Sequence, residues 1–119
     1  MKITARIYLD TVLRTADIAF LFPGQGSQSV GMGRELSSLY PTARSIYQEA
    51  DDSLGIPLAQ LSWEGPQELL NDTINTQPAL LTHSVAVLSV LQQNYPHVRP
   101  AYVAGHSMGE ISTLVAAGV

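Results

Sequence analysis

Apolar residues along the chain fall into two short runs separated by helical stripes. The run at residues 18–22 is continuous, and Pro23-Gly24 ends it at once, which is typical of a buried parallel strand. A second short run at residues 101–104 predicts another strand, followed by a glycine-bounded turn and a helix over residues 110–117. The pattern thus places one predicted strand on each side of a long helical region.

Two helices are predicted directly after the first strand, over residues 32–39 and 41–54. In the second, apolar positions recur at the i, i+3, i+4, i+7 spacing, Pro41 suits the first turn, and Gly55 supplies the stop. Residues 57–72 are expected to form short helical turns, interrupted at Gly65-Pro66. This part of the chain is therefore predicted to be helical throughout.

Thr76 is the candidate N-cap of a longer helix that continues to about residue 94. Apolar residues cover most of its circumference, so we expect it to be largely buried. The resulting order of strand, helices, strand, turn and helix is that of an α/β fold with parallel strands. Two parallel strands are few for such a sheet, so we expect the chain to be a truncated part of a larger domain.

The composition is that of a globular protein with at most one domain in its 119 residues, which we assign to residues 18–119. Hydrophobic residues make up 45% and charged residues 13%, and the net charge of −4 argues against a nucleic-acid surface. The absence of cysteine excludes disulfides, thiolate metal sites and cysteine nucleophiles. No apolar run approaches the roughly 18 residues of a membrane span, so we expect a cytoplasmic protein without membrane contact.

Residues 1–17 do not read as a targeting signal. Arg6, Asp10 and Arg14 interrupt any apolar stretch that a secretory signal would need, and Asp10 and Asp17 are atypical of a transit peptide. We therefore expect a short N-terminal extension, such as one from a misassigned start codon.

Residues 105–109 read Gly-His-Ser-Met-Gly and fit the pattern G-x-S-x-G between a predicted strand and a predicted helix. In that setting the pattern indicates a nucleophile elbow, which would hold the Ser107 hydroxyl exposed above the sheet. The N–H of Met108 would then stabilise an oxyanion, helped by the helix dipole. The same residues allow a simpler interpretation, a capping box formed by Ser107 and Glu110, and spacing alone leaves both open.

A serine nucleophile needs a base, and none of the histidines is a persuasive partner. His106 neighbours Ser107 in sequence, so its side chain is expected to point away. His83 lies on the buried helix and is expected to be structural, and His97 lies in a proline-flanked loop. The residues by themselves therefore indicate half of a catalytic site.

A glycine-rich loop at residues 24–28 follows the first strand. It matches neither the dinucleotide-binding pattern nor the P-loop, so nucleotide binding is disfavoured. Open α/β sheets bind ligands at the carboxyl ends of their strands, where this loop and Ser107 would face one crevice if the strands are neighbours. The amide or backbone N–H of Gln25 is then a candidate second oxyanion donor; a tight turn without a site role is the alternative.

Three ordered stretches, residues 22–28, 76–80 and 105–110, resemble the malonyl-CoA:acyl carrier protein transacylases of fatty acid synthesis and the acyltransferase domains of polyketide synthases. The resemblance runs from about residue 18 to residue 119. It implies the N-terminal part of an α/β-hydrolase-like core, ending before the inserted ferredoxin-like subdomain of that family.

The resemblance also implies a reaction. Ser107 would take the malonyl group from malonyl-CoA as an ester and pass it to the phosphopantetheine thiol of acyl carrier protein, with Gln25 and Met108 forming the oxyanion hole. It implies no cofactor and no metal, malonyl-CoA being the acyl donor substrate.

The departures from the family pattern are large. Its catalytic histidine, its carboxylate-binding arginine and its subdomain have no match in residues 1–119, so malonyl is not favoured over methylmalonyl or acetyl by any residue here. We therefore expect the chain to be a fragment that is inactive by itself. The alternatives are a serine esterase or thioesterase, which would release free acid, and a catalytically inactive remnant.

Overall fold

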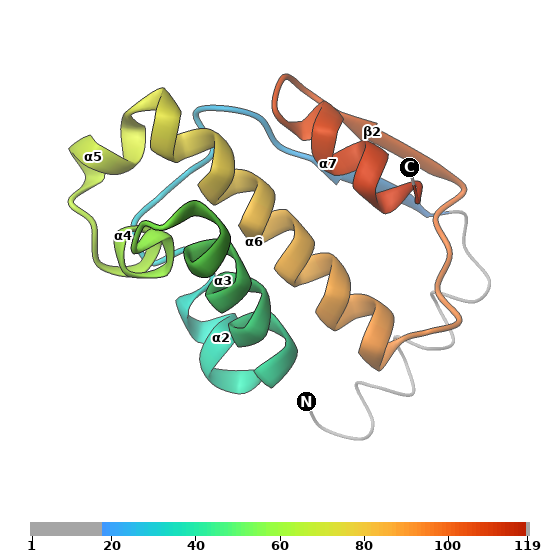
Figure 1. Ribbon diagram of the computed structural model, residues 1–119. Coiled ribbons are helices and arrows are strands. Elements are labelled where there is room, and N and C mark those ends of the chain that lie inside the picture. Colours follow the sequence, from blue (N-terminus) through green and yellow to red (C-terminus); the bar gives the residue numbers. More distant parts are fainter. Residues whose placement is uncertain (1–17, 119) are drawn as a thin grey trace.

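The computed structural model describes residues 18–118, so the extension at residues 1–17 lies outside the described residues. Within this range two strands and six helices follow one another, labelled as in Figure 1. They are β1 (Ala19–Phe22), α2 (Arg34–Leu39), α3 (Pro41–Leu54), α4 (Leu58–Glu64), α5 (Gln67–Asn71), α6 (Thr73–Asn94), β2 (Tyr102–Gly105) and α7 (Gly109–Ala116).

The two strands pair in parallel, which confirms the predicted α/β arrangement. The register runs from Ala19 opposite Tyr102 to Phe22 opposite Gly105. Because both strands point the same way, the loop after β1 and the turn after β2 leave the sheet at one edge (Figure 1). This pairing creates the shared edge on which the site depends.

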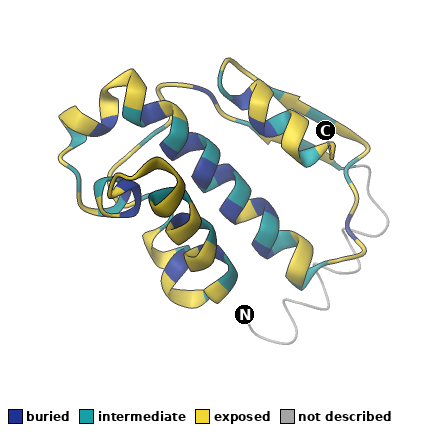
Figure 2. Ribbon diagram, viewed as in Figure 1, coloured by how far each residue is buried: buried dark blue, intermediate teal, exposed yellow. Residues whose placement is uncertain are grey.

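Helix α6 is the central element of the fold. It lies between α3 on one side and α7, which covers the strand pair, on the other (Figure 1). Buried positions recur along its length, whereas the strands and α7 are mainly half-buried or exposed (Figure 2). Its buried Ala86 and Val90 pack with α3 and α4, and its Ala79 packs with Leu58 and Leu70. The core therefore belongs to the helices rather than to the sheet.

The predicted start of the long helix was wrong by about one helical turn. Helix α6 begins at Thr73, after the extended Asp72, and Thr76 lies within it. The Thr76 hydroxyl donates a hydrogen bond to the Leu70 carbonyl at the end of α5 instead of capping its own helix. Pro78 is accommodated inside the helix. The side chain that was predicted to cap the helix thus hydrogen-bonds to the preceding helix instead.

The other helix bounds differ little from the prediction, and the largest shift has a clear cause. Helix α2 begins at Arg34 rather than at residue 32, since Gly31 and Gly33 have φ values of 101° and 81°. These left-handed values break the helical backbone before it starts. A side chain at Gly33 would also collide with the Tyr47 phenol, so this turn packs tightly on α3.

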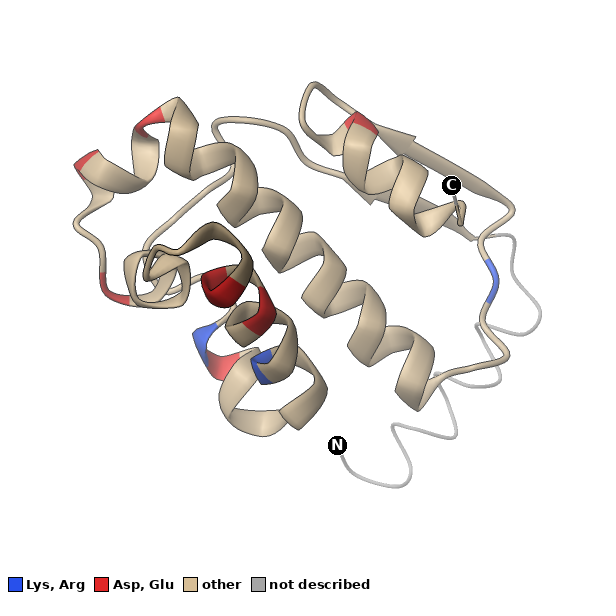
Figure 3. Cartoon of the chain, viewed as in Figure 1, with Lys and Arg blue, Asp and Glu red and all other residues tan. Residues whose placement is uncertain are grey.

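Charge is distributed unevenly over the described chain. Acidic residues gather on α2 to α5, whereas α6 carries no charged residue (Figure 3). Arg99 and Glu110 are the only charged residues between residue 73 and residue 118. Among the described residues, no helix is both long and apolar enough to cross a bilayer.

Apolar side chains are exposed on the strand pair and α7. Leu21 on β1 is 76% exposed and Tyr102 on β2 is 75% exposed, and Ile111 and Leu114 on α7 are also exposed. An uncharged parallel pair with apolar faces is a template for association.

We therefore expect the 119-residue chain to self-associate, and Leu21→Lys to reduce the association. Sedimentation velocity over a tenfold range of protein concentration measures this directly. A monodisperse monomer with a cooperative melt would contradict the expectation.

Candidate active site

The turn between β2 and α7 holds Ser107 in a left-handed backbone conformation. Its φ is 56°, and it is the single residue other than glycine with a positive φ in residues 18–118. Such a conformation costs a residue with a side chain about 1–2 kcal/mol, so the surroundings must enforce it. Two hydrogen bonds close the turn: Gly109 N–H donates to the His106 carbonyl and Glu110 N–H to the Ser107 carbonyl, both at 3.0 Å. The structure thus has the strand, sharp turn and helix expected of a nucleophile elbow.

The two glycines of the pattern are required by close contacts. A Cβ on Gly105 would collide with the carbonyl oxygen of Gly109 and would lie 2.5 Å from the Thr113 hydroxyl. A Cβ on Gly109 would collide with the carbonyl oxygen of Phe22 at the end of β1. Side chains at either position would push the turn away from the sheet, so the spacing of the motif reflects packing as well as backbone freedom.

The glycine-rich loop after β1 lies directly against this turn. Gly24 is buried, and a Cβ there would collide with the His106 carbonyl and approach the Ser107 Cβ to 3.0 Å. From the other side, His106 N–H donates to the Phe22 carbonyl at 3.3 Å. The neighbouring strands therefore bring the two predicted loops together at one edge of the sheet.

The backbone N–H groups of Gln25 and Met108 have no acceptor within the described part of the chain. Met108 follows Ser107 in sequence, and Gln25 follows Gly24, which packs against the Ser107 turn. The Gln25 side chain is turned elsewhere, since its amide donates to the Thr73 hydroxyl at 3.1 Å. Of the two donors considered for Gln25, the backbone N–H is the one that makes no hydrogen bond in residues 18–118. Its role, like that of Met108, remains a prediction.

The alternative capping box is not formed. Helix α7 begins at Gly109, one residue before its predicted start, with Met108 as N-cap and no side-chain cap. The exposed Glu110 carboxylate makes no hydrogen bond to Ser107 N–H in residues 18–118. The Ser107 side chain is therefore not committed to capping.

The histidines are placed as the sequence suggested. The three in the sequence are all described, and none hydrogen-bonds to Ser107. His97 precedes β2, at the opposite end of that strand from Ser107, and the His106 side chain is exposed. His83 is structural: its Nδ1 lies 3.2 Å from the hydroxyl oxygen of the fully buried Tyr47. The Tyr47 hydroxyl donates its hydrogen to the Met32 carbonyl at 3.3 Å, so its oxygen is left to accept from His83.

Burial controls the ionisation of this pair. It lowers the pKa of His83 below its ordinary value of 6.5 and raises the pKa of Tyr47. At His83 the unfolded chain then binds a proton more tightly than the folded one. The contribution of His83 to the free energy of unfolding is therefore complete above pH 6.5 and is lost as the pH falls below it.

We expect the melting temperature to fall between pH 7.5 and about 5.5, and His83→Asn to remove part of that fall. Asparagine keeps a polar group near Tyr47 but does not titrate. Thermal melts followed by circular dichroism measure both chains. If the melting temperatures of the two proteins fell equally with pH, His83 would not be the group whose protonation lowers the stability.

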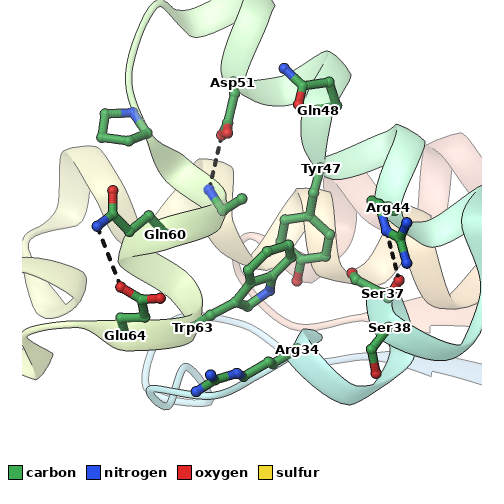
Figure 4. Close-up of a pocket in the computed structure, with 12 residues that line it drawn as sticks. Arg34, Ser37, Ser38, Arg44, Tyr47, Gln48, Asp51, Gln60, Trp63 and Glu64 are labelled. Atoms are coloured by element: carbon green, nitrogen blue, oxygen red, sulfur yellow. Dashed lines mark hydrogen bonds between the residues drawn. The ribbon is translucent and has the colours of Figure 1, made fainter.

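A pocket of about 590 Å³ lies between α2, α3 and α4, and none of its lining residues belongs to the two loops described above (Figure 4). The Tyr47 and Trp63 rings meet in it with centroids 5.2 Å apart and an interplanar angle of 57°. Its Asp51 carboxylate accepts the Ala59 N–H at 2.9 Å and so joins α3 to α4. These contacts are those of a helix junction, not of the candidate site.

The sequence did not point to the residues that hold the glycine-rich loop in place. The Thr73 hydroxyl accepts a hydrogen bond from the Gln25 side-chain amide, and the Asn71 side chain accepts one from Gln28. The Gln67 side chain accepts one from the N–H of Val30, two residues after the loop. The sequence shows only that amide residues are concentrated in the loop and in the segment after Gly65-Pro66. It does not indicate which of these amides hydrogen-bond to one another.

Comparisons with known proteins agree with this geometry. The acyl transferase domain family model matches residues 19–119. The chain is 52% identical over 101 residues to the malonyl CoA-acyl carrier protein transacylase of Bacillus subtilis strain 168, covering 85% of this chain and 31% of that protein.

The chain is also similar to solved structures of malonyltransferases. The acyl carrier protein S-malonyltransferase of Vibrio cholerae superposes with a TM-score of 0.81 at 48% identity, over 87% of this chain and 34% of that one. A malonyl-transacylase in complex with a type II polyketide synthase acyl-carrier protein superposes with a TM-score of 0.83 at 47% identity, over 87% of this chain and 33% of that one. The chain thus spans about one third of the length of these relatives. It belongs to the acyl transferase domain family.

Proposed function

We propose that this chain carries the acyl-accepting part of a transferase that moves a malonyl group from coenzyme A to the phosphopantetheine thiol of acyl carrier protein. The observation that carries the proposal is the left-handed Ser107 at the strand–helix turn, with the loop of Gly24 packed against it. The names of the relatives support malonyl as the acyl group, and the complex of one of them supports an acyl carrier protein as partner.

The first proposed step transfers the acyl group to the protein. The Ser107 hydroxyl oxygen attacks the thioester carbonyl, its proton passes to a base, and the carbon–sulfur bond breaks as coenzyme A leaves as a thiol. The second step is the reverse on another thiol, in which the carrier sulfur attacks the serine ester and Ser107 regains its proton. Both steps pass through a tetrahedral oxyanion.

The N–H groups of Gln25 and Met108 are the proposed donors to that oxyanion. Both lack an acceptor in residues 18–118; Met108 follows Ser107 in the chain, and Gln25 follows Gly24, which packs against the turn of Ser107. The start of α7 adds the positive end of a helix dipole at the same place. Removing one such donor typically lowers the rate by about 10²–10³-fold.

No histidine is hydrogen-bonded to Ser107 in residues 18–118. A general base typically contributes about 10²–10⁴-fold in rate, so we expect the 119-residue chain to acquire the acyl group slowly and to turn over little. Slow ester formation on Ser107 therefore fits the proposal.

The test of the proposed function is the fate of the acyl group. The chain is incubated with radiolabelled malonyl-CoA and holo acyl carrier protein, with Ser107→Ala as the matched control. Because we expect slow ester formation without catalytic turnover, the label on the carrier thiol should not exceed the amount of chain present, should lie above the control, and should be accompanied by little free malonate. Release of free malonate without carrier labelling would instead identify a thioesterase, and equal labelling with Ser107→Ala would overturn the role of Ser107.

A further inference from the structure

Side-chain amides connect the glycine-rich loop to helix α5. The Gln28 Oε1 accepts the Gly26 N–H at 2.8 Å, and its Nε2 donates to the Asn71 Oδ1 at 3.0 Å. Gln28 is the last residue of the loop and Asn71 is the last residue of α5, so the bond spans 43 residues of sequence. A single amide thus links a loop N–H to a distant helix.

A second amide makes a parallel connection. The Gln67 Oε1 accepts the Val30 N–H at 3.0 Å, and its Nε2 donates to the same Asn71 Oδ1 at 2.8 Å. Gln28 and Gln67 are both half-buried. The N–H of Gly26 in the loop and the N–H of Val30, two residues after the loop, are therefore both connected to one oxygen atom through two glutamines.

The donors and acceptors in this network follow from the backbone. A backbone N–H can only donate, so each glutamine must turn its oxygen towards the loop and its NH₂ towards Asn71. Asn71 must then present its oxygen, with two lone pairs, to both glutamines. All members are neutral, so the network does not titrate.

The network fixes the loop on both sides of one candidate donor. Gly26 is tied to Gln28, and Gly24 packs against the turn of Ser107, so Gln25 lies between two held residues. The Gln25 side chain is held by Thr73, which leaves its N–H as the group without an acceptor in the described range.

We propose that Asn71 is a positioning residue: through Gln28 and Gln67 it holds the glycine-rich loop so that Gln25 N–H faces Ser107. This rests on the proposed function, in which that N–H is an oxyanion donor. Asn71 itself touches no reacting atom. Its contribution is geometric, and displacing a reacting group by about 1 Å can cost about 10²-fold in rate.

The test compares Asn71→Asp with Asn71→Leu in the full chain. Aspartate keeps oxygen acceptors for both glutamines, whereas leucine has a similar shape and no acceptor. Amide hydrogen exchange is followed by NMR at Gly26 and Val30, and ester formation on Ser107 from malonyl-CoA is followed by mass spectrometry. We expect about tenfold faster exchange at both amides in Asn71→Leu and near wild-type exchange in Asn71→Asp.

Ester formation should follow the same order. We expect Asn71→Leu to lower the maximal rate of Ser107 acylation by about 10–10²-fold with little change in the malonyl-CoA concentration at half saturation. Unchanged exchange in Asn71→Leu overturns the proposal whatever the acylation rate. Faster exchange with an unchanged acylation rate also overturns it and leaves the proposed function intact.

Two further results keep the inference testable. If Asn71→Leu does not fold, Gln67→Met replaces it, because this variant removes only the connection from Val30 to Asn71. Amide exchange at Val30 should then become faster while exchange at Gly26 stays slow. Equally faster exchange at both amides would overturn the network. If the wild-type chain forms no ester, the proposed function fails. In that case the claim that Asn71 orders the loop is tested by amide exchange at Gly26 and Val30 alone. Exchange as slow in Asn71→Leu as in the wild type would overturn that claim too.

Discussion

Replacing Gly109 by alanine is expected to lower the free energy of unfolding by at least about 2 kcal/mol and to abolish acylation of Ser107. Gly109 is the first residue of α7, and its added methyl group would collide with the Phe22 carbonyl oxygen, a backbone atom that cannot rotate away. Helix propensity by itself predicts the opposite, a gain of about 1 kcal/mol on exchanging glycine for alanine. The sign of the effect therefore separates the close contact from propensity.

The matched control is Gly55→Ala at the end of α3. Gly55 has a φ of 68°, and a Cβ there meets nothing within 4 Å, so we expect a loss of about 1 kcal/mol from conformation alone. Urea unfolding of both variants supplies the comparison. A Gly109→Ala protein as stable as the wild type would show that the turn after β2 does not pack on β1 as described.

Replacing Ser107 by glycine should make the chain more stable and leave it unable to form an ester. The serine has a φ of 56°, which disfavours any residue with a Cβ, and glycine adopts it without that cost. We expect a gain of about 1 kcal/mol, reduced by the greater freedom of glycine in the unfolded chain. Stability and function would then oppose each other at one residue, as strain retained for a functional purpose requires.

Ser107→Ala is the control for this prediction. Alanine loses the hydroxyl but keeps the Cβ, so it should abolish the ester without the gain in stability. Thermal melts and intact-mass measurements on the three proteins test both parts. If Ser107→Gly were markedly less stable than the wild type, the left-handed turn would not be a source of strain.

Sequence reasoning predicted the frame of the site because that frame depends on local signals. The apolar run before Pro23-Gly24 and the glycines around Ser107 each specify a strand followed by a sharp turn. The order of elements predicts parallel strands, but the meeting of the two loops was predicted only on the condition that the strands are neighbours. Their pairing in the structure meets that condition and brings Gly24 to the turn of Ser107.

The features that the sequence did not predict depend on which hydrogen-bond partner each polar side chain takes in the fold. Thr76 has the chemistry of an N-cap, but the Leu70 carbonyl takes its hydroxyl, so α6 starts at Thr73. Likewise, the convergence of Gln28 and Gln67 on Asn71 joins residues that are 43 and 4 positions apart. Hydrogen-bonding capacity can be read from a residue type, whereas the choice of partner is made by the fold.

The most direct measurement of the central claim is the location of the acyl group after incubation with malonyl-CoA. The chain is quenched in acid, digested and mapped by tandem mass spectrometry beside the Ser107→Ala protein. The account predicts a malonyl ester on Ser107 and none on the variant. An ester on another residue, or equal modification of both proteins, would contradict the claim that the turn between β2 and α7 presents the nucleophile.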